Sequence, residues 1–438
     1  MQQTIEDALR GLDGEVESSE EVLASFADDF SRSSHRAAPL AVFRPRTAEA
    51  VSELMVLARR HGVRVTVRGQ GHTTGGQSLA PGGIVLDTRG LHGVWELSEG
   101  AVWVGAGTLW SELVHETLSS SLMPPVLTGY LGLSVGGTLS VGGIGLRSYR
   151  YGAQTDNVLE LEVVTGAGEH FVCSPDRHAD LFDACRAGLG QFGTICAARL
   201  RLVEAPARVH AYDLLYTDPQ VCLREQERLM QQGRFAEVGS MVVPHEGRWA
   251  YLLQLAFDGG PDSDGAGELL DDLPPPDGGC ETMALSCREF VDRVEAKANA
   301  MKDAGLWAAP HPWTSFFLPA SRMPDFVEEL TVAMQVDDLG YGSIGLYPLR
   351  RGPFRTPGLR LPSDELFYLL AILPNAFPPS PERTAKLVEL GRAFYRRCID
   401  MGGTLYPIGL CPNEGWRLEA HPRRRELDPG GVLAPGLG

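Results

Sequence analysis

The chain has 438 residues, of which 43% are hydrophobic and 22% charged, as in an ordinary soluble globular protein with two or three domains. Lysine and arginine number 39 against 56 aspartate and glutamate residues, so the net charge is −17. A nucleic-acid binder needs a basic face that displaces counterions. This balance therefore argues against nucleic acid, and against an anionic membrane surface, as partners.

The N-terminal sequence and the cysteine pattern indicate the cellular compartment in which the protein is expected. The first residues, MQQTIEDALRGLDGEVESSEEV, lack the basic and apolar regions of a signal peptide. No run of about 18 apolar residues predicts a transmembrane helix. The eight cysteines form no CxxC pair, and their spacings suit neither a zinc site nor a small disulfide scaffold. We expect a cytoplasmic protein with free buried thiols, no metal and no membrane partner.

The first half alternates predicted strands and helices. A strand over 41–43 ends at Pro45, and Thr47 can cap a helix over 48–61 that Gly62 stops. Residues 63–68 alternate apolar and polar, as a half-buried strand does. The other expected elements are strands over 84–86, 102–104 and 159–173 and helices over 110–118 and 180–187. This β-α-β order predicts an α/β unit over roughly 35–205.

The second half changes character. Residues 241–257 are typical of a hairpin that turns at His245-Glu246-Gly247, and YGSIGLYPL and ELFYLLAIL predict further strands. Their order predicts an antiparallel sheet with helices between its strands. The acidic, Gly- and Pro-rich stretch over 259–279 is interpreted as a solvated loop.

Three glycine-rich segments carry the strongest signal. They are RGQGHTTGGQ over 68–77, GLSVGGTLSVGGIG over 132–145 and GLGQFGTI over 188–195. The first follows a strand, but its G-x-G-x-x-x-G spacing and the following Ser-Leu-Ala-Pro disfavour a Rossmann fingerprint. Glycine backbone can lie against a flat or charged ligand because no side chain blocks its approach. Together the segments indicate one large phosphate-bearing cofactor, with tight strand packing as the alternative.

These segments resemble those of a known family. RGQGHTTGGQSLAPGGIVLDTRGL resembles the covalent-flavin loop of the vanillyl-alcohol-oxidase, or PCMH, type of FAD enzymes. LGLSVGGTLSVGGIG, DNVLELEVVTGAGE, ADLFDACRAGLGQFGTI and VLAPG are similar to the cytokinin dehydrogenase branch, and APHPWTSFFLPASR and SDELFYLLAIL extend the likeness through the second half. The resemblance implies an α+β fold: a PCMH-type FAD-binding domain of two α/β subdomains over 1–205, a substrate domain over 206–405 with an antiparallel sheet flanked by helices, and a segment over 406–438 that returns to the FAD domain. It places the site between the domains.

The resemblance also implies the cofactor residues. His72 stands where the family's histidine bonds the flavin 8α-methyl carbon, and no cysteine lies between 121 and 150 to add the second link that some relatives have. We therefore expect one covalent bond to FAD, through His72. The other implied cofactor-binding residues are Gly69, Gln70, Gly71, Thr73, Gln77, Gly129, Ser134, Gly136, Gly137, Ser140, Gly143, Ile144 and Ile195.

Two positions depart from the family. Cytokinin dehydrogenases have an aspartate in a W-T-D-Y context that helps remove the substrate amine's proton, and this chain has Gly129 in Leu127-Thr128-Gly129-Tyr130. Glycine can do no acid–base work, so a cytokinin is a doubtful substrate. Leu437 replaces a glutamine that contacts the cofactor in the family. Asp156 and Glu160 lie nearby and are interpreted as structural.

Candidate catalytic residues come from the second half. We select Tyr347, Arg350, Tyr406 and His311, and note His245, Arg322 and Asn413 as weaker candidates. Tyr347 and Arg350 lie three apart in a predicted strand and therefore point to opposite faces. Arg350, Arg351, Arg355 and Arg360 could hold a substrate carboxylate, or could form a solvated basic turn. A carboxylate there would suit oxidative decarboxylation, known in relatives of the myxobacterial chondrochloren type.

The expected function is an FAD-dependent oxidase or dehydrogenase of secondary metabolism. A small natural-product substrate gives a hydride to flavin N5, and O₂ or another acceptor reoxidises the flavin; oxidative decarboxylation is a variant of this reaction. A cytokinin-like secondary-amine dehydrogenase and a non-catalytic, flavin-containing binding protein are the alternatives. The sequence does not predict the oligomeric state.

Overall fold

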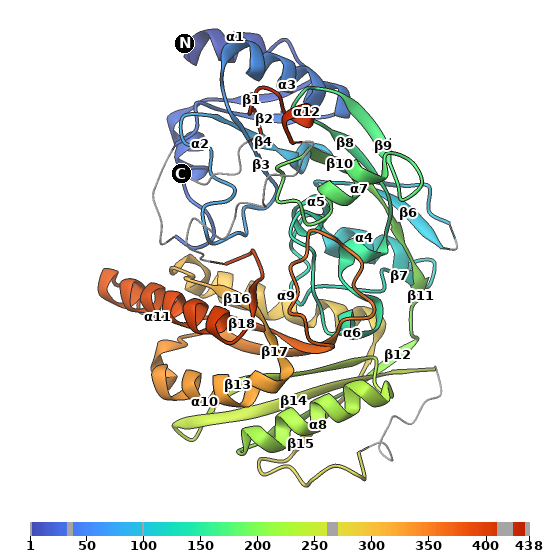
Figure 1. Ribbon diagram of the computed structural model, residues 1–438, viewed down its shortest axis with the longest axis vertical. Coiled ribbons are helices and arrows are strands. Elements are labelled where there is room, and N and C mark those ends of the chain that lie inside the picture. The colour runs from blue at the N-terminus through green and yellow to red at the C-terminus, as the bar shows by residue number, and fades with distance from the viewer. Residues whose placement is uncertain (1, 33–37, 99, 261–269, 410–423, 434–438) are drawn as a thin grey trace.

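The protein consists of two halves, which the computed structural model describes over residues 2–32, 38–98, 100–260, 270–409 and 424–433 (Figure 1). One half holds a four-stranded and a five-stranded sheet, and the other an eight-stranded sheet with its helices. The predicted α+β class is confirmed. No helix in these ranges has both the length and the apolar character needed to cross a membrane.

The first sheet is partly parallel and positions the first glycine loop. Its order is β1 (Gly14–Glu17), β2 (Ala41–Pro45), β4 (Ile84–Asp87) and β3 (Val65–Arg68). Strands β2, β4 and β3 are parallel, and β1 is antiparallel to β2. Helix α3 (Ala48–His61) begins at the Thr47 cap, whose hydroxyl accepts from Ala50 N–H, and ends at Gly62 with φ 63°. Both predicted helix ends are confirmed. Helices α1 (Gln2–Leu9) and α2 (Glu20–Ser25) complete this part.

The second sheet is entirely antiparallel, which corrects the prediction of a single α/β unit. Its order is β5 (Val94–Trp95), β6 (Ala101–Gly105), β10 (Thr194–Arg201), β8 (Val158–Val164) and β9 (His170–Cys173). The single strand predicted over 159–173 is wrong, because β8 and β9 form a hairpin. Its turn is closed by Thr165 N–H donating to Glu169 O, with Gly168 at φ 86°.

The connections of this half contain short elements. Helix α4 (Trp110–Leu118) matches its prediction, and α7 (Ala179–Cys185) is shifted slightly from the predicted 180–187. The others are β7 (Leu122–Met123), α5 (Val135–Leu139), α6 (Ser148–Tyr151), β11 (Val203–Glu204) and the 3₁₀ helices η1 (Thr88–Gly90) and η2 (Gln154–Asn157). Strands β7 and β11 pair with each other.

The eight-stranded sheet is antiparallel throughout. Its order is β15 (Cys280–Ser286), β12 (Arg208–Tyr216), β14 (Arg248–Gly259), β13 (Glu237–His245), β17 (Ser343–Arg350), β18 (Leu366–Leu373), β16 (Thr314–Pro319) and β19 (Thr404–Leu405). The predicted hairpin is confirmed: Glu246 and Gly247, both at positive φ, connect β13 to β14. The strands predicted from YGSIGLYPL and ELFYLLAIL are β17 and β18.

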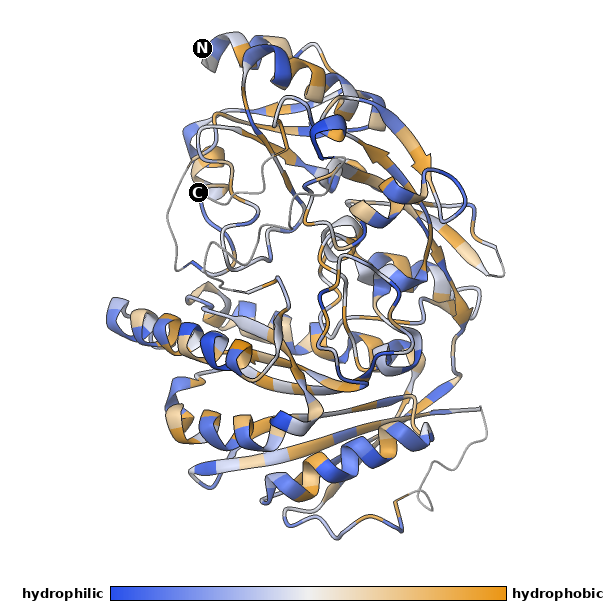
Figure 2. Ribbon diagram, viewed as in Figure 1, coloured by the Kyte–Doolittle hydropathy of each residue, from blue (hydrophilic) through white to orange (hydrophobic). Residues whose placement is uncertain are grey.

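Helices flank this sheet. They are α8 (Pro219–Gln232), α9 (Cys287–Asp303), α10 (Met323–Ala333) and α11 (Pro381–Asp400), with the 3₁₀ helices η4 (Leu306–Ala308), η5 (Ala320–Arg322) and η6 (Val336–Asp338). Helices α8 and α11 carry hydrophobic and hydrophilic stripes, as helices that bury one face do (Figure 2). Helix α9 lies between the halves and contacts both α4 and β12 (Figure 1).

Two further connections tie the halves together. The buried Arg147 guanidinium donates to both carboxylate oxygens of Asp258, at 2.7 and 2.9 Å, and to Glu237 at 3.3 Å. After β19 the chain returns to the first sheet through α12 (Arg424–Leu427). There Val65 N–H donates to Val432 O at 2.8 Å, beside the strand that leads into the first glycine loop.

Candidate functional site

The first two glycine segments lie next to each other, with Gly69 against the side chain of Ser134. The loop after β3 places Gly69 so close to Ser134 that a Cβ at residue 69 would lie 2.0 Å from Ser134 Oγ. Ser134 is the N-cap of α5, which carries Gly136 and Gly137. Further along, Gly143 has φ 75°, and a Cβ there would lie 2.0 Å from Gln154 Oε1. A side chain at either position would displace the side chain of Ser134 or Gln154, and the positive φ of Gly143 also favours glycine.

The third segment joins the second. Ala187 N–H donates to Leu139 O and Leu189 N–H donates to Ser140 O, both at 2.9 Å, so residues 187–190 run along α5. Ile195 follows in β10 and packs in the core of the five-stranded sheet. The structure therefore brings together the three segments that the sequence singled out.

His72 lies in a cluster of aromatic rings contributed by both halves. Its imidazole stacks on Phe30 with centroids 3.9 Å apart, and Phe30 in turn stacks on His311 at 4.2 Å. Tyr130, Trp307 and Trp313 lie between 5.3 and 6.0 Å from the same imidazole. Part of the His72 surface stays accessible although protein atoms surround the ring densely.

Residues 29–31, which follow α2, hold the loop that carries His72. Phe30 N–H donates to both Gly71 O and Thr73 O at 3.1 Å, so its backbone brackets His72. Asp29 accepts from Gly76 N–H at 2.7 Å. His311 N–H donates to Ser31 O at 2.8 Å, which connects the half that contains the eight-stranded sheet to the same segment. Phe30 was not predicted from the sequence, because nothing in its local pattern relates it to a loop about 40 residues away.

Both histidines are held neutral. Burial lowers the pKa of His72 to about 3, and the nearby His311 and Lys302 lower it further. Burial likewise lowers the pKa of His311 to about 4. His311 Nε2 lies 3.0 Å from Asn375 Nδ2, which can only donate. The His311 proton is therefore assigned to Nδ1, and Nε2 is the acceptor.

Tyr130 and Lys302 form the rim of this cluster. Lys302 Nζ lies 3.2 Å from Tyr130 Oη and 5.4 Å from the centroid of the Trp307 ring. Gly129, beside Tyr130, is exposed, and a Cβ there would meet no atom within 4 Å.

One of the two candidate tyrosines, Tyr406, contacts the second glycine segment. Gly143 N–H donates to Tyr406 Oη at 3.2 Å. Burial raises the pKa of both Tyr406 and Tyr347. Arg350 is exposed and its Nε donates to Tyr149 O at 2.9 Å. As predicted from their spacing, Tyr347 and Arg350 have different surroundings.

The remaining candidates lie elsewhere or outside the described residues. His245 lies at the β13–β14 turn and Arg322 is exposed in η5. Arg355 and Arg360 are exposed. Asn413 and Leu437 lie outside the described residues.

The two acidic residues interpreted as structural make structural contacts. Asp156 accepts from the backbone N–H groups of Ala153 and Arg355, and Glu160 pairs with Arg177 and Arg199.

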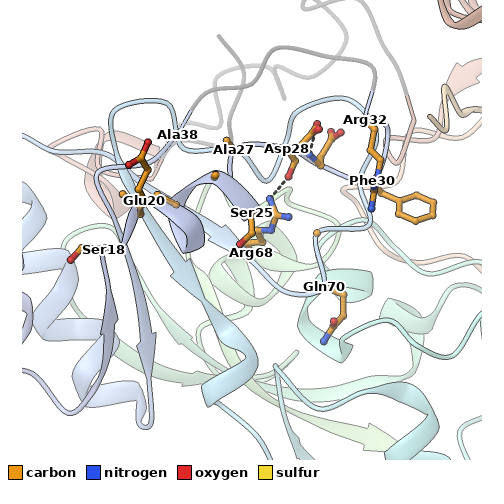
Figure 3. A pocket seen from close by; sticks show the side chains of 14 residues that line it. Ser18, Glu20, Ser25, Ala27, Asp28, Phe30, Arg32, Ala38, Arg68 and Gln70 are labelled. Atoms are coloured by element: carbon orange, nitrogen blue, oxygen red, sulfur yellow. Dashed lines mark hydrogen bonds between the residues drawn. The ribbon is translucent and has the colours of Figure 1, made fainter. Parts of the chain in front are cut away.

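A cavity of about 920 Å³ adjoins the loop that carries His72 (Figure 3). Residues of the 18–32 stretch line it together with Arg68, Gln70 and Gly71. Arg68 Nη1 donates to Asp28 O at 2.8 Å, while Phe30 and Gln70 point away from this pair (Figure 3). Phe30 belongs both to the lining of this cavity and to the aromatic cluster.

Comparisons with known proteins agree with this architecture. An FAD binding domain family matches residues 39–174, and the family described as cytokinin dehydrogenase 1, FAD and cytokinin binding, matches 268–437. An uncharacterized oxidoreductase of the fasciation locus of Rhodococcoides fascians is 37% identical, over 94% of this chain and 96% of its own length. Cytokinin dehydrogenase 6 of Oryza sativa subsp. japonica is 32% identical, over 91% and 86%.

A solved structure has the same fold. The 6-hydroxy-D-nicotine oxidase of Arthrobacter nicotinovorans superimposes with a TM-score of 0.75 over 96% of each chain, at 21% identity. The similarities in sequence extend over both halves and over all three glycine segments. The resemblance inferred from the motifs is confirmed, and the chain belongs to the PCMH-type FAD-dependent oxidoreductases, in the family of the cytokinin dehydrogenases.

Proposed function

We propose that this chain holds FAD by one covalent bond through His72 and oxidises a small organic substrate between its two halves. The FAD-binding domain takes residues 1–205 together with 406–438, and the substrate domain takes 206–405. The course of the chain supports this division, because the eight-stranded sheet runs from Arg208 to Leu405 and Val432 returns to β3.

The glycine segments fit the cofactor. Gly69 and Gly143 lie where a Cβ would collide, and the buried Gln154 Oε1 accepts no hydrogen bond from the described residues. An unused polar atom beside a glycine-rich segment suits a polar ligand that approaches the backbone closely. The first loop, from Gly69 to Gln77, and the second segment, from Ser134 to Ile144, would hold FAD. When bound, FAD supplies a ring that accepts a hydride from the substrate.

The proposal of a covalent link rests on the protonation state of the His72 imidazole and on the contacts that surround it. A histidine can bond a carbon only through an unprotonated ring nitrogen. The pKa of His72 is lowered to about 3, so the imidazole is neutral throughout the physiological range. Stacking on Phe30 and the backbone bonds on either side of residue 72 fix the direction of the ring. His72 is thus a preorganised nucleophile rather than an exposed loop histidine.

The tyrosines supply donors rather than a base. Burial keeps Tyr347 and Tyr406 protonated at neutral pH, since it raises the pKa of both. Tyr406 Oη already accepts from Gly143 N–H, so its own proton is directed elsewhere. We propose that these hydroxyls orient a substrate oxygen or nitrogen. Oxidation then proceeds by hydride loss without a carboxylate base at position 129.

Oxidative decarboxylation gains no support from the arginines. Arg350 Nε is used by Tyr149 O, and Arg355 and Arg360 are exposed. Decarboxylation stays a prediction from the sequence, as does the choice of O₂ or another electron acceptor.

Acid precipitation of the purified yellow protein tests the covalent link. Colour should stay with the precipitated polypeptide of the wild type and should be released from His72→Ala. The control is His61→Ala, since His61 is an exposed residue at the end of α3. Colour in the wild-type supernatant would refute the covalent bond. Anaerobic mixing with alcohols, amines and carboxylic acids then tests oxidation, because a true substrate bleaches the flavin.

A further inference from the structure

We propose that Lys302 and Tyr130 form a subsite for an anionic group, a carboxylate or phenolate, on an aromatic substrate. This inference rests on the proposed function and names the substrate class for the same site. It concerns the rim of the His72 cluster, where the C-terminal turn of α9 reaches across to the segment before α5.

The geometry presents two donors side by side. Lys302 Nζ lies 3.2 Å from Tyr130 Oη and 3.1 Å from Asn299 Oδ1. An ammonium has three hydrogens and no acceptor, so Tyr130 Oη accepts from Lys302 and its own proton stays available. The third hydrogen of the ammonium is also unused by these two contacts. An ammonium and a hydroxyl in contact match the two oxygens of a carboxylate.

In the part of the chain that the structure describes, the positive charge of Lys302 has no carboxylate partner. Among the described residues no carboxylate oxygen lies within 4.0 Å of Lys302 Nζ, whereas Lys386 pairs with Asp338 at 2.6 Å. The neighbouring Gly129 contributes no charge. The chain has only three lysines, and its net charge is −17. The positive charge of Lys302 at the rim of the site is therefore opposite in sign to the net charge of the protein. Such a cation attracts an anion to this rim.

Aromatic rings provide the walls of the subsite. The Lys302 ammonium lies 5.6 Å from the centroid of Tyr130 and 5.4 Å from that of Trp307, and the two ring centroids are 5.7 Å apart. The same rings lie 5.3 and 5.9 Å from His72. Flat apolar faces next to a cation suit a planar ring with an acidic substituent. The anion would then lie next to the residue proposed to hold the flavin.

Three matched probes test this assignment in the flavin-loaded protein. Benzoate, benzamide and benzylamine share one ring and differ in charge. We expect benzoate to bind more tightly than the other two, measured by isothermal titration calorimetry and by perturbation of the visible flavin spectrum. Lys302→Met should weaken benzoate binding by about 10-fold and leave benzamide unchanged, and Tyr130→Phe should weaken benzoate by about 3-fold.

The control is Lys297→Met, because Lys297 is an exposed lysine on the same helix. It should bind benzoate like the wild type. Equal affinity for benzoate and benzamide, or unchanged benzoate binding in Lys302→Met, would overturn the subsite.

Failure of the subsite and failure of the proposed function can be told apart. Acid-stable colour reports the flavin link alone, and it should be present in every variant of the Lys302–Tyr130 pair. A colourless wild type would refute the flavin proposal, and calorimetry with benzoate would still decide the subsite. Acid-stable colour without a preference for benzoate would refute the subsite alone.

Discussion

The ring of Phe30 lies flat against the imidazole of His72, with planes inclined by 18°. The other face of Phe30 is covered by His311, also at 18°, so one phenyl ring is stacked between two imidazoles. His311 belongs to the half that contains the eight-stranded sheet. The orientation of His72 therefore depends on contact between the two halves.

Phe30→Ala should reduce covalent flavin attachment. Removing the ring leaves His72 free to rotate, and bond formation depends on a fixed approach of the nucleophile. We expect the acid-stable flavin fraction to fall about 10-fold while bound FAD is retained in part. The measurement is in-gel flavin fluorescence against total flavin. Phe171→Ala, on strand β9, is the control. Full acid-stable flavin in Phe30→Ala would contradict a positioning role.

Stability should fall on acidification because of His311. Its folded-state pKa is about 4 against an ordinary value of 6.5, so the unfolded chain binds more protons between these values. The stabilising contribution is complete above pH 6.5 and is lost as the pH falls toward 4, at up to about 1.4 kcal/mol per unit. His311→Phe keeps a ring on Phe30 and removes the titration. Urea unfolding at pH values of about 7 and 5 should show a smaller loss in the variant. An identical loss would contradict the assignment.

Arg147→Met should destabilise the protein strongly. The guanidinium is 8% exposed and neutralises Asp258 and Glu237 across the two halves. Its loss leaves two carboxylates close together without their main partner, at a cost of about 3 kcal/mol in the free energy of unfolding. Replacing Asp258 and Glu237 by Asn and Gln in the same variant should restore much of that loss. As a control, Arg10→Met breaks only exposed pairs and should change stability by less than about 0.5 kcal/mol.

Gly129→Asp should be tolerated and should favour amine oxidation. The backbone of Gly129 lies outside the left-handed region and a Cβ has open space, so the melting temperature should change by less than about 2 °C. A carboxylate at this position could accept an amine proton, and general bases contribute at least about 100-fold. Anaerobic bleaching by N6-isopentenyladenine should therefore be faster than in the wild type. Gly129→Asn adds the same bulk without a base, and an equal gain in that variant would refute the acid–base explanation.

The sequence correctly predicted those helices and turns whose ends contain capping residues or glycines. Thr47 and Gly62 bound α3 as expected, and Glu246-Gly247 forms the predicted turn. The prediction failed at β8 and β9, because apolar residues continue on both sides of a short turn. Gly166 and Gly168 mark that reversal, and glycines in a strand pattern do not by themselves distinguish a turn from a bulge.

The site was predictable only where its parts are local. The three glycine segments are each visible within about ten residues, and their convergence followed from family resemblance. The aromatic cluster unites residues 30, 72, 130, 307, 311 and 313, whose separations in the chain reach far beyond any periodicity. His72 and His311 were singled out separately, but Phe30, which joins them, was not.

The backbone bond from Val65 to Val432 has a consequence for biosynthesis. β3 leads directly into the His72 loop, and Val432 and Leu433 form part of the core beneath that strand. These partners leave the ribosome more than 300 residues after Val65. The nascent N-terminal half thus lacks part of its own core until Val432 and Leu433 have been synthesised. Chains interrupted within the eight-stranded sheet should therefore leave β3 without this partner and expose part of that core.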